Sequence, residues 1–357
     1  MSNSNQNIRV GITIGDINGI GPEVIMKALD DQRILQNLTP IIYASSKVLS
    51  FHKKNMKLEE FHYQSIRKAD EANASKIYVI NLWKDEPEFK LGEVTQTGGK
   101  CAFESLEAAT QDLASGKIDV LVTAPISKEA IAKADFKFPG HTEYLADLSG
   151  QQDALMLMIA DKLRVGLVTT HVALSEVSKL ITIERVYNKL KEFESSLKRD
   201  FGIRRPKIAV LGLNPHAGEH GKMGEEEQTA IIPAINRAKN EGLLSFGPYP
   251  ADGFFGSGSI AEFDGILAMY HDQGLTGFKA LAFDQGVNFT AGLPIVRTSP
   301  DHGTAFDIAG KDIASPDSFR HALYLAVDIY RTRMFEKEIV SDVLEVTPPK
   351  EKYTKEK

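Results

Sequence analysis

The sequence predicts an α/β fold built on a largely parallel sheet. Short apolar runs alternate with stretches of helical periodicity along most of the chain, which is the pattern of repeated strand–helix units. Most runs are apolar at every position rather than at alternate positions, as expected for strands covered on both faces. The expected strands lie at 8–15, 39–45, 76–83, 118–126, 163–174, 207–215 and 264–271.

Two of the intervening stretches are typical of amphipathic helices. Segment 98–116 has an apolar stripe through Phe103, Leu106 and Leu113 and stops at Gly116. Segment 225–242 begins with three glutamates and ends with lysine, asparagine, glutamate and glycine. An acidic start and a basic residue near the end suit the helix dipole, so we expect a helix in each segment.

The length of 357 residues allows two domains or one large two-lobed unit. No internal repeat and no long low-complexity linker divides the sequence, so we expect interleaved lobes rather than domains in series. The lysine-rich segment 346–357 is expected to be a frayed tail.

The composition excludes several classes of protein. A formal net charge of -6 argues against broad nucleic-acid binding, and no run approaches the roughly 18 apolar residues of a membrane span. The single cysteine, Cys101, cannot form an intrachain disulfide and fits a reducing compartment. The N-terminal residues are polar and show no secretory signal. We therefore expect a cytoplasmic protein that binds neither nucleic acid nor membrane.

Three of the expected strands end on a histidine: His171, His216 and His271. Ligands of open α/β sheets bind beyond the carboxyl ends of the strands, and three imidazoles suit zinc, cobalt, nickel or iron while leaving positions for a substrate. The histidines are 45 and then 55 positions apart, which matches no local zinc motif. Two interpretations stay open: one shared metal site, or three hydrogen-bonded loop residues. The adjacent Asp272 could orient an imidazole, act as a base or form a turn.

Two segments indicate an anion pocket. Lys279, Asn288 and Arg297 stand among glycines and apolar residues, where they could hold a phosphate or a carboxylate. His141 and Thr142 precede a helix expected to start near residue 143, which also suits an anion, although Thr142 could be an ordinary N-cap. The glycine-rich segment 10–24 contains neither G-x-G-x-x-G nor a Walker lysine, which favours a tight turn.

Taken together, eight segments resemble, in the same order, the 4-hydroxythreonine-4-phosphate dehydrogenase family. They are ITIGDINGIGPEV, TAPISKEA, FPGHTEYLA, VTTHVAL, LNPHAGEHGKMGEEE, GPYPADGFF, MYHDQGL and VNFTAGLPIVRTSPDHGTAFDIAGK. The resemblance runs from about residue 8 to 335. It implies a two-lobed α/β/α fold of the isocitrate and isopropylmalate dehydrogenase kind, which binds NAD without a Rossmann domain.

The resemblance also implies roles for individual residues. The metal ligands would be His171, His216 and His271, and the substrate contacts would be His141, Thr142, Lys279, Asn288 and Arg297. The nucleotide would lie against His302, Gly303, Asp307 and Gly310. Residues 1–129 and 299–345 would form the nucleotide-side lobe, and residues 130–298 the metal, substrate and dimerisation lobe.

The expected reaction is oxidation of 4-phosphohydroxy-L-threonine at C3 in pyridoxal phosphate biosynthesis. It needs NAD or NADP and one divalent metal per site, with zinc preferred and magnesium or cobalt as alternatives. Asp272 and Asp252 are the candidate bases. The family also implies a homodimer whose two chains share each active site. The sequence does not decide between NAD and NADP, the metal, the base or the part played by the enzyme in decarboxylation.

Other functions are compatible with parts of the sequence. Relatives within the family act on threonate or erythronate phosphates or on unphosphorylated diols, and Lys279, Asn288 and Arg297 favour a phosphorylated hydroxy acid. A metal-binding storage or regulatory protein, or a zinc hydrolase or lyase, would also use the histidines. Neither class explains segment 301–311.

Overall fold

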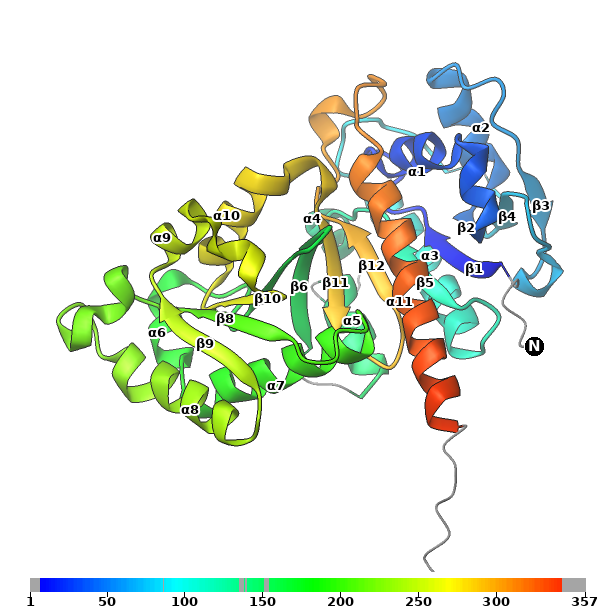
Figure 1. Ribbon diagram of the computed structural model, residues 1–357. Helices are drawn as coiled ribbons and strands as arrows, with labels where there is room; N and C mark the ends of the chain where they lie inside the picture. Colours follow the sequence, from blue (N-terminus) through cyan, green and yellow to red (C-terminus); the bar gives the residue numbers. More distant parts are fainter. Residues whose placement is uncertain (1–6, 86, 135–137, 139, 151–153, 342–357) are drawn as a thin grey trace, which may run out of the picture.

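The computed structural model describes residues 7–85, 87–134, 138, 140–150 and 154–341. In these residues twelve strands form one sheet with the order β3-β4-β2-β1-β5-β12-β11-β6-β7-β10-β8-β9 (Figure 1). The strands are β1 (Ile8–Thr13), β2 (Leu38–Ala44), β3 (Gln64–Ile66), β4 (Tyr78–Asn81), β5 (Val120–Thr123), β6 (Leu155–Ala160), β7 (Leu163–Leu167), β8 (Lys207–Leu211), β9 (Leu244–Tyr249), β10 (Gly265–Ala268), β11 (Val287–Ala291) and β12 (Arg297–Pro300).

The sheet is parallel on both flanks and antiparallel in the middle. β6 runs antiparallel to both β7 and β11, and β11 runs antiparallel to β12. The other pairs, from β3 to β12 and from β7 to β9, are parallel. The prediction of a largely parallel sheet is therefore confirmed, and the antiparallel centre is a feature that the sequence analysis did not predict.

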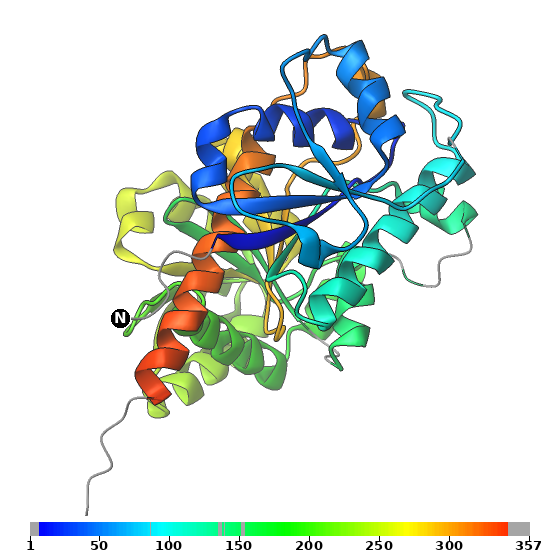
Figure 2. The same cartoon turned by 90° about the vertical axis from the view of Figure 1, so that its right-hand side faces the viewer.

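Helices cover both faces of the sheet. They are α1 (Gly21–Leu29), α2 (Ser46–Asn55), α3 (Gln96–Ala114), α4 (Lys128–Lys133), α5 (His141–Leu148), α6 (Leu174–Leu180), α7 (Ile183–Arg199), α8 (Ile232–Asn240), α9 (Ala251–Gly256), α10 (His271–Ala282) and α11 (Asp317–Ser341). Figure 2 shows α11 and α3 on opposite sides of the N-terminal strands. The α/β class and the layered arrangement are confirmed.

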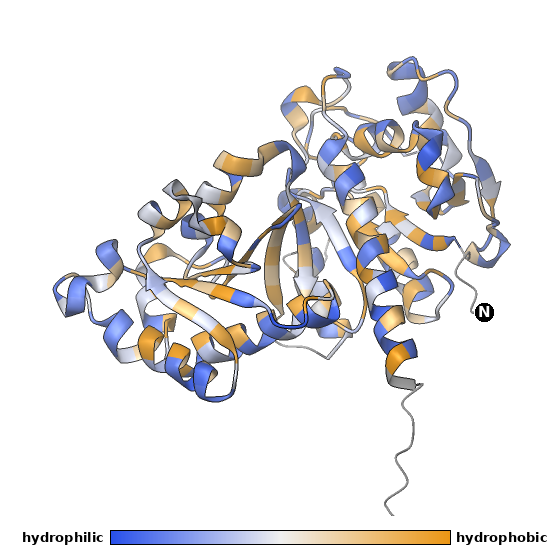
Figure 3. Ribbon diagram, in the orientation of Figure 1, coloured by the Kyte–Doolittle hydropathy of each residue, from blue (hydrophilic) through white to orange (hydrophobic). Residues whose placement is uncertain are grey.

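Alternate strand residues enter different apolar clusters. Val120 and Val122 belong to the large apolar cluster that also includes residues of α1, α2, α7, α8 and α11, whereas Leu121 belongs to a second cluster with Leu106 and Ala109 of α3. In the other half of the sheet, Ala209 faces α9 and α10. Strands buried on both faces explain why the runs are apolar at every position, and Figure 3 shows this apolar colouring along the central strands.

All seven expected strands are present; six are shorter than their apolar runs, and β2 has the expected length but begins one residue earlier. Sequence reasoning missed β3, β6, β9, β11 and β12. Elements β1 to β5 and β6 to β10 form two groups in Figure 1, joined through β11 and β12. The lobe boundaries at 129/130 and 298/299 stay predictions, and the tail 346–357 lies outside the described residues.

Cys101 is a buried free thiol on α3, and burial raises its pKa to about 12. This suits the unreactive role expected for it. Among the described residues, no helix combines the length and apolar composition needed to cross a membrane.

Candidate active site

The three strands that precede the histidines are neighbours in the sheet. β10 pairs in parallel with both β7 and β8, so the carboxyl ends of these strands meet at one edge. The pairing continues past the strand ends, because the N–H of Thr169 donates to the carbonyl of Met269 at 3.1 Å. This segment order places the residues that follow β7 beside those that follow β10.

His171 and His271 lie close together, with ring centroids 5.7 Å apart. His271 is the first residue of α10, and its Nδ1 lies 2.7 Å from Oδ1 of Asp272. Because the carboxylate can only accept, Nδ1 of the neutral ring carries the proton and Nε2 keeps its lone pair. A carboxylate that orients an imidazole in this way is a common partner of metal-binding histidines.

Gln273 connects the segment of His271 to the end of β8. Its Nε2 donates to the carbonyl of Gly212 at 2.6 Å, and its Oε1 accepts from the N–H of Met269 at 2.8 Å. The segments that carry His216 and His271 are thus tied by one side chain.

His216 lies in a left-handed turn, η3 (Pro215–Gly221). All five residues from 216 to 220 have positive φ, and only Gly218 among them is a glycine. The left-handed conformation costs roughly 1–2 kcal/mol for each ordinary residue. Such strain is most common at functional sites, where the surrounding structure must maintain it.

The described part of the chain holds no group of three histidine, cysteine, aspartate or glutamate side chains close enough to bind a metal. One chain therefore brings together His171 and His271 without completing the expected set with His216. The donor types suit zinc or cobalt, and the orientation of His271 supports such a role. The three-histidine metal site stays a prediction.

A cavity of about 250 Å³ adjoins His171. It collects several of the residues expected to bind substrate or nucleotide, namely His141, Asn288, Arg297, His302 and Gly303. Sequence reasoning missed Thr123, Lys128 and Ser299, which also line it. Lys128 could have been noticed as a lysine directly after an expected strand, but Thr123 is hidden within an apolar run.

Arg297 is the most buried charge of this cavity, with 3% of its surface exposed. Its Nε and Nη2 donate to Oγ1 of Thr123 at 3.0 and 2.6 Å, and Nη2 lies 3.4 Å from Nδ1 of His141. A buried guanidinium in the wall of a cavity can bind an anionic ligand there.

His141 is held neutral at the floor of the cavity. Burial, reinforced by the charge of Arg297, keeps its pKa well below the ordinary value. Because Arg297 can only donate, Nδ1 of His141 accepts and Nε2 carries the proton. In the part of the chain that the structure describes, neither this buried Nε2 nor Oδ1 of Asn288 has a hydrogen-bond partner. Buried polar atoms of this kind are available to hydrogen-bond a polar ligand in the cavity.

Lys279 does not join Asn288 and Arg297 in this cavity. It forms an ion pair of 3.1 Å with Asp301 and lines an adjacent hollow of about 200 Å³. His302 lines both spaces. The expected cluster of three is thus divided between two neighbouring hollows in one chain, because Lys279 comes from α10 whereas the other two side chains come from β11 and β12.

The glycine-rich segment near the N-terminus packs against the loop that contains His302 and Gly310. The N–H of Ile20 donates to the carbonyl of Thr304 at 3.0 Å, and a Cβ on Gly19 would meet that oxygen at 2.8 Å. The tight turn predicted here therefore allows the backbone of Thr304 to approach Gly19 closely, because glycine has no side chain. The adjacent hollow also contains Ile20 and Ile308, an apolar setting suited to a flat ring.

Burial lowers the pKa of His302, and no described residue forms a hydrogen bond with its Nε2. Gly303 and Asp307 are exposed, and Gly310 has a φ of +74°. The apolar walls and the unpartnered ring nitrogen fit a nucleotide, and the roles of these four residues stay predictions.

Two further expected residues can be placed only in part. α5 begins at His141, so Thr142 lies inside the first turn rather than before a helix starting at 143. The side chain of Thr142 falls outside the described part of the structure. Asp252 is exposed in the first turn of α9, and Asp272 is exposed beside His271.

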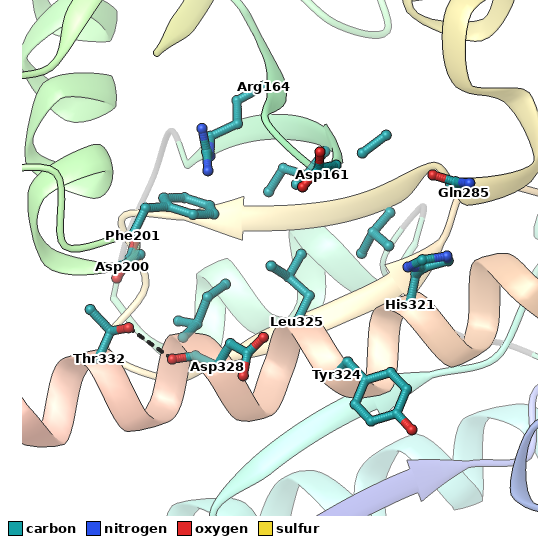
Figure 4. A pocket seen from close by; sticks show the side chains of 14 residues that line it. Asp161, Arg164, Asp200, Phe201, Gln285, His321, Tyr324, Leu325, Asp328 and Thr332 are labelled. Carbon is teal, nitrogen blue, oxygen red and sulfur yellow. Dashed lines mark hydrogen bonds between the residues drawn. The ribbon is translucent and has the colours of Figure 1, made fainter. Parts of the chain in front are cut away.

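A separate hollow of about 300 Å³ lies between the β6–β7 turn and α11 (Figure 4). The guanidinium carbon of Arg164 lies 4.6 Å from the ring centroid of Phe201 there. None of the expected site residues lines this hollow; its carboxylates Asp161 and Asp328 are exposed, and its third, Asp200, is buried and accepts from Arg333. We assign no ligand to it.

Comparison with known proteins agrees with the motifs. Residues 36–326 match the family model described as pyridoxal phosphate biosynthetic protein PdxA. The chain is 50% identical to the 4-hydroxythreonine-4-phosphate dehydrogenase of Bacteroides thetaiotaomicron, over 92% of this chain and 91% of the relative. It is 41% identical to the putative D-threonate 4-phosphate dehydrogenase of Oceanobacillus iheyensis, over 91% of this chain and 98% of the relative.

A solved structure supports the same assignment. The 4-hydroxythreonine-4-phosphate dehydrogenase of Klebsiella pneumoniae superposes with a TM-score of 0.78 at 35% identity, covering 92% of this chain and 99% of that one. The family expected from the motifs is thereby confirmed. The chain belongs to the PdxA family of pyridoxal phosphate biosynthetic proteins and is a dehydrogenase.

Proposed function

We propose that this protein oxidises 4-phosphohydroxy-L-threonine at C3, using NAD⁺ or NADP⁺ and a divalent metal, in pyridoxal phosphate biosynthesis. The product is 2-amino-3-oxo-4-phosphooxybutanoate. Loss of CO₂ then gives 3-amino-2-oxopropyl phosphate, because the new ketone accepts the electron pair of the broken bond and C2 takes up a proton. Support comes from relatives named for the 4-hydroxythreonine-4-phosphate substrate at identities up to 50%.

The observation that carries the proposal is the cavity floor made by Arg297, His141 and Asn288 beside His171. It offers a buried cation and an unpartnered Nε2–H donor for anionic oxygens. A phosphorylated hydroxy acid supplies both anionic groups and a hydroxyl. Arg297, His141 and Asn288 would fix the substrate away from the reacting carbon, and so orient C3.

His171, His216 and His271 would hold the metal, zinc in preference to magnesium or cobalt. When bound, the metal would stabilise negative charge on the C3 oxygen and the nicotinamide would accept the hydride. His302, Gly303, Asp307 and Gly310 would lie against the nucleotide.

The hydroxyl proton needs an acceptor near the histidines. Asp272 is hydrogen-bonded to His271, which favours an orienting role for its carboxylate. Asp252 is the other candidate base, and an exposed carboxylate on α9 could reach a substrate from a neighbouring subunit.

We also propose a homodimer whose subunits complete each other's sites. Exposed apolar side chains follow two of the histidines: Leu174 is 73% exposed and Met223 is 43% exposed. Apolar exposure of this extent beside a functional segment suits a subunit contact. A partner chain would also explain why one chain separates Lys279 from Arg297.

D-threonate 4-phosphate is the alternative substrate, since a relative at 41% identity is named as its putative dehydrogenase. The two substrates differ by an amine in place of a hydroxyl. The phosphate, carboxylate and C3 hydroxyl that Arg297 and the histidines would recognise are common to both.

The test is formation of reduced nicotinamide by the purified protein with each substrate, with NAD⁺ or NADP⁺, and with Zn²⁺, Mg²⁺ or Co²⁺. Turnover of 4-phosphohydroxy-L-threonine at higher kcat/KM than D-threonate 4-phosphate is expected. The reverse order would select the alternative, and no turnover of either would refute both.

A further inference from the structure

The left-handed turn that contains His216 has an unusual support. Directly before it stands Asn214, an extended residue with three N–H donors. All three are used: the backbone N–H donates to Oε1 of Glu227 at 2.7 Å, and Nδ2 donates to Oε2 of Glu227 at 2.9 Å and to Oε2 of Glu226 at 2.7 Å.

Glu227 is fully buried, with 0% of its surface exposed. Burial of a carboxylate is costly unless its oxygens accept hydrogen bonds. Here both oxygens accept from Asn214, so the carboxylate fixes the orientation of the residue that leads into Pro215 and His216.

The turn is also moulded around this carboxylate. A Cβ on Gly218 would meet Oε2 of Glu227 at 2.5 Å, and a Cβ on Gly212 would meet Oε1 at 3.1 Å. The backbone on both sides of His216 therefore approaches the carboxylate closely. Gly218 has a φ of +76° within the left-handed run.

The helix that carries Glu227 is itself irregular. Residues Glu227–Ile231 form a π-helical turn before α8 begins. A π turn inserts an extra residue into a helix and is frequent at functional sites. Two rare backbone conformations thus meet at one buried carboxylate.

We propose that Glu227 is a positioning residue for His216. Its buried carboxylate holds Asn214 and maintains the left-handed turn, so that the imidazole of His216 is presented for metal binding. This inference rests on the proposed function only in its assignment of His216 as a metal ligand.

A role confined to fold stability is the alternative, and metal affinity separates the two. Glu227→Gln keeps the size of the side chain but replaces one acceptor oxygen by an NH₂ group facing a donor. Mutation of a residue that supports a metal ligand typically lowers metal affinity by about 10- to 100-fold. The matched control is Asp200→Asn, a buried carboxylate between α7 and α11 that accepts from Ser196 and Arg333.

The experiment titrates metal-free full-length protein with Zn²⁺ or Co²⁺ and records thermal unfolding of the same samples. Glu227→Gln should bind metal at least 10-fold more weakly, and high metal concentration should restore most of its kcat. Asp200→Asn should lower the unfolding temperature with wild-type metal affinity. Unchanged affinity in Glu227→Gln, whatever its stability, would overturn the proposal.

Two more variants complete the test. Asn214→Ala removes the side-chain donor of the same contact and decides the matter if Glu227→Gln does not fold; it should weaken metal binding, and wild-type affinity would count against the inference. His216→Ala should abolish metal binding, and excess metal should not restore it. If His216→Ala binds metal normally, the proposed metal site has failed rather than the role of Glu227 alone.

Discussion

Nη2 of Arg297 lies 3.4 Å from Nδ1 of His141, so a permanent cation fixes the tautomer of a buried neutral imidazole. The proton of His141 is thereby placed on Nε2, which has no hydrogen-bond partner among the described residues. The charged guanidinium of Arg297 and the neutral Nε2–H of His141 can therefore both donate to one anionic ligand.

Arg297→Ala should raise KM for the phosphorylated substrate by about 10- to 100-fold, because hydrogen bonds to charged groups contribute roughly 1.5–3 kcal/mol each. Steady-state kinetics at saturating cofactor would measure it. Arg164→Ala, in the hollow of Figure 4, is the control and should leave KM unchanged. A wild-type KM in the Arg297 variant would remove the anion-binding role.

His216→Ala should lose the bound metal and reduce turnover to background while keeping the fold. Its side chain is exposed, so replacing it with alanine removes no packing contact in the core. Elemental analysis, far-ultraviolet circular dichroism and activity would be measured on one preparation. Full activity in a variant free of metal would contradict the metal assignment.

Mixed dimers of His171→Ala and Lys279→Ala chains should recover part of the activity that each variant lacks. If each active site takes His171 from one chain and Lys279 from the other, the heterodimer contains one site with both residues changed and one site with both intact. Co-expression with two affinity tags would isolate the mixed species. Verified heterodimers as inactive as the parents would argue that each chain uses both residues in the same site.

Asp16→Asn should remove a pH dependence of stability. Asp16 is fully buried, and burial raises its pKa from 3.8 to about 6. The folded state then binds the proton more tightly than the unfolded state, so stability falls as pH rises from about 4 to about 6 and stays lower above it. The shift corresponds to about 3 kcal/mol.

Urea unfolding between pH 4 and pH 8 would compare Asp16→Asn with the wild type. The variant should gain stability relative to the wild type as the pH rises through this window. Asp161→Asn, an exposed carboxylate in a left-handed position that asparagine tolerates, is the control. A constant difference between Asp16→Asn and wild type at every pH would contradict the raised pKa.

The sequence was informative where chemistry coincides with strand ends. Uniformly apolar runs located seven strands, and their parallel pairing explains the proximity of His171 and His271. Asn288 and Arg297 stand among glycines and apolar residues in the sequence, and the structure places them on the antiparallel strands β11 and β12. The glycine and proline between them marked a hairpin connection rather than a long loop.

Other features were not accessible from the sequence. Thr123 supports Arg297 across 174 positions of sequence, and no local pattern reports such a contact. The left-handed run at His216 includes four residues other than glycine. Such a conformation is unfavourable locally and is maintained by tertiary contacts such as those of Glu227.

Asn288 and Arg297 belong to neighbouring strands that join the two groups of the sheet. β11 pairs with β6, and β12 pairs with β5. A small molecule bound by both side chains would therefore link the two groups of strands through the middle of the sheet. Ligand binding should then make β11 and β12 more rigid. Amide hydrogen exchange should become slower in these central strands rather than in the outer loops.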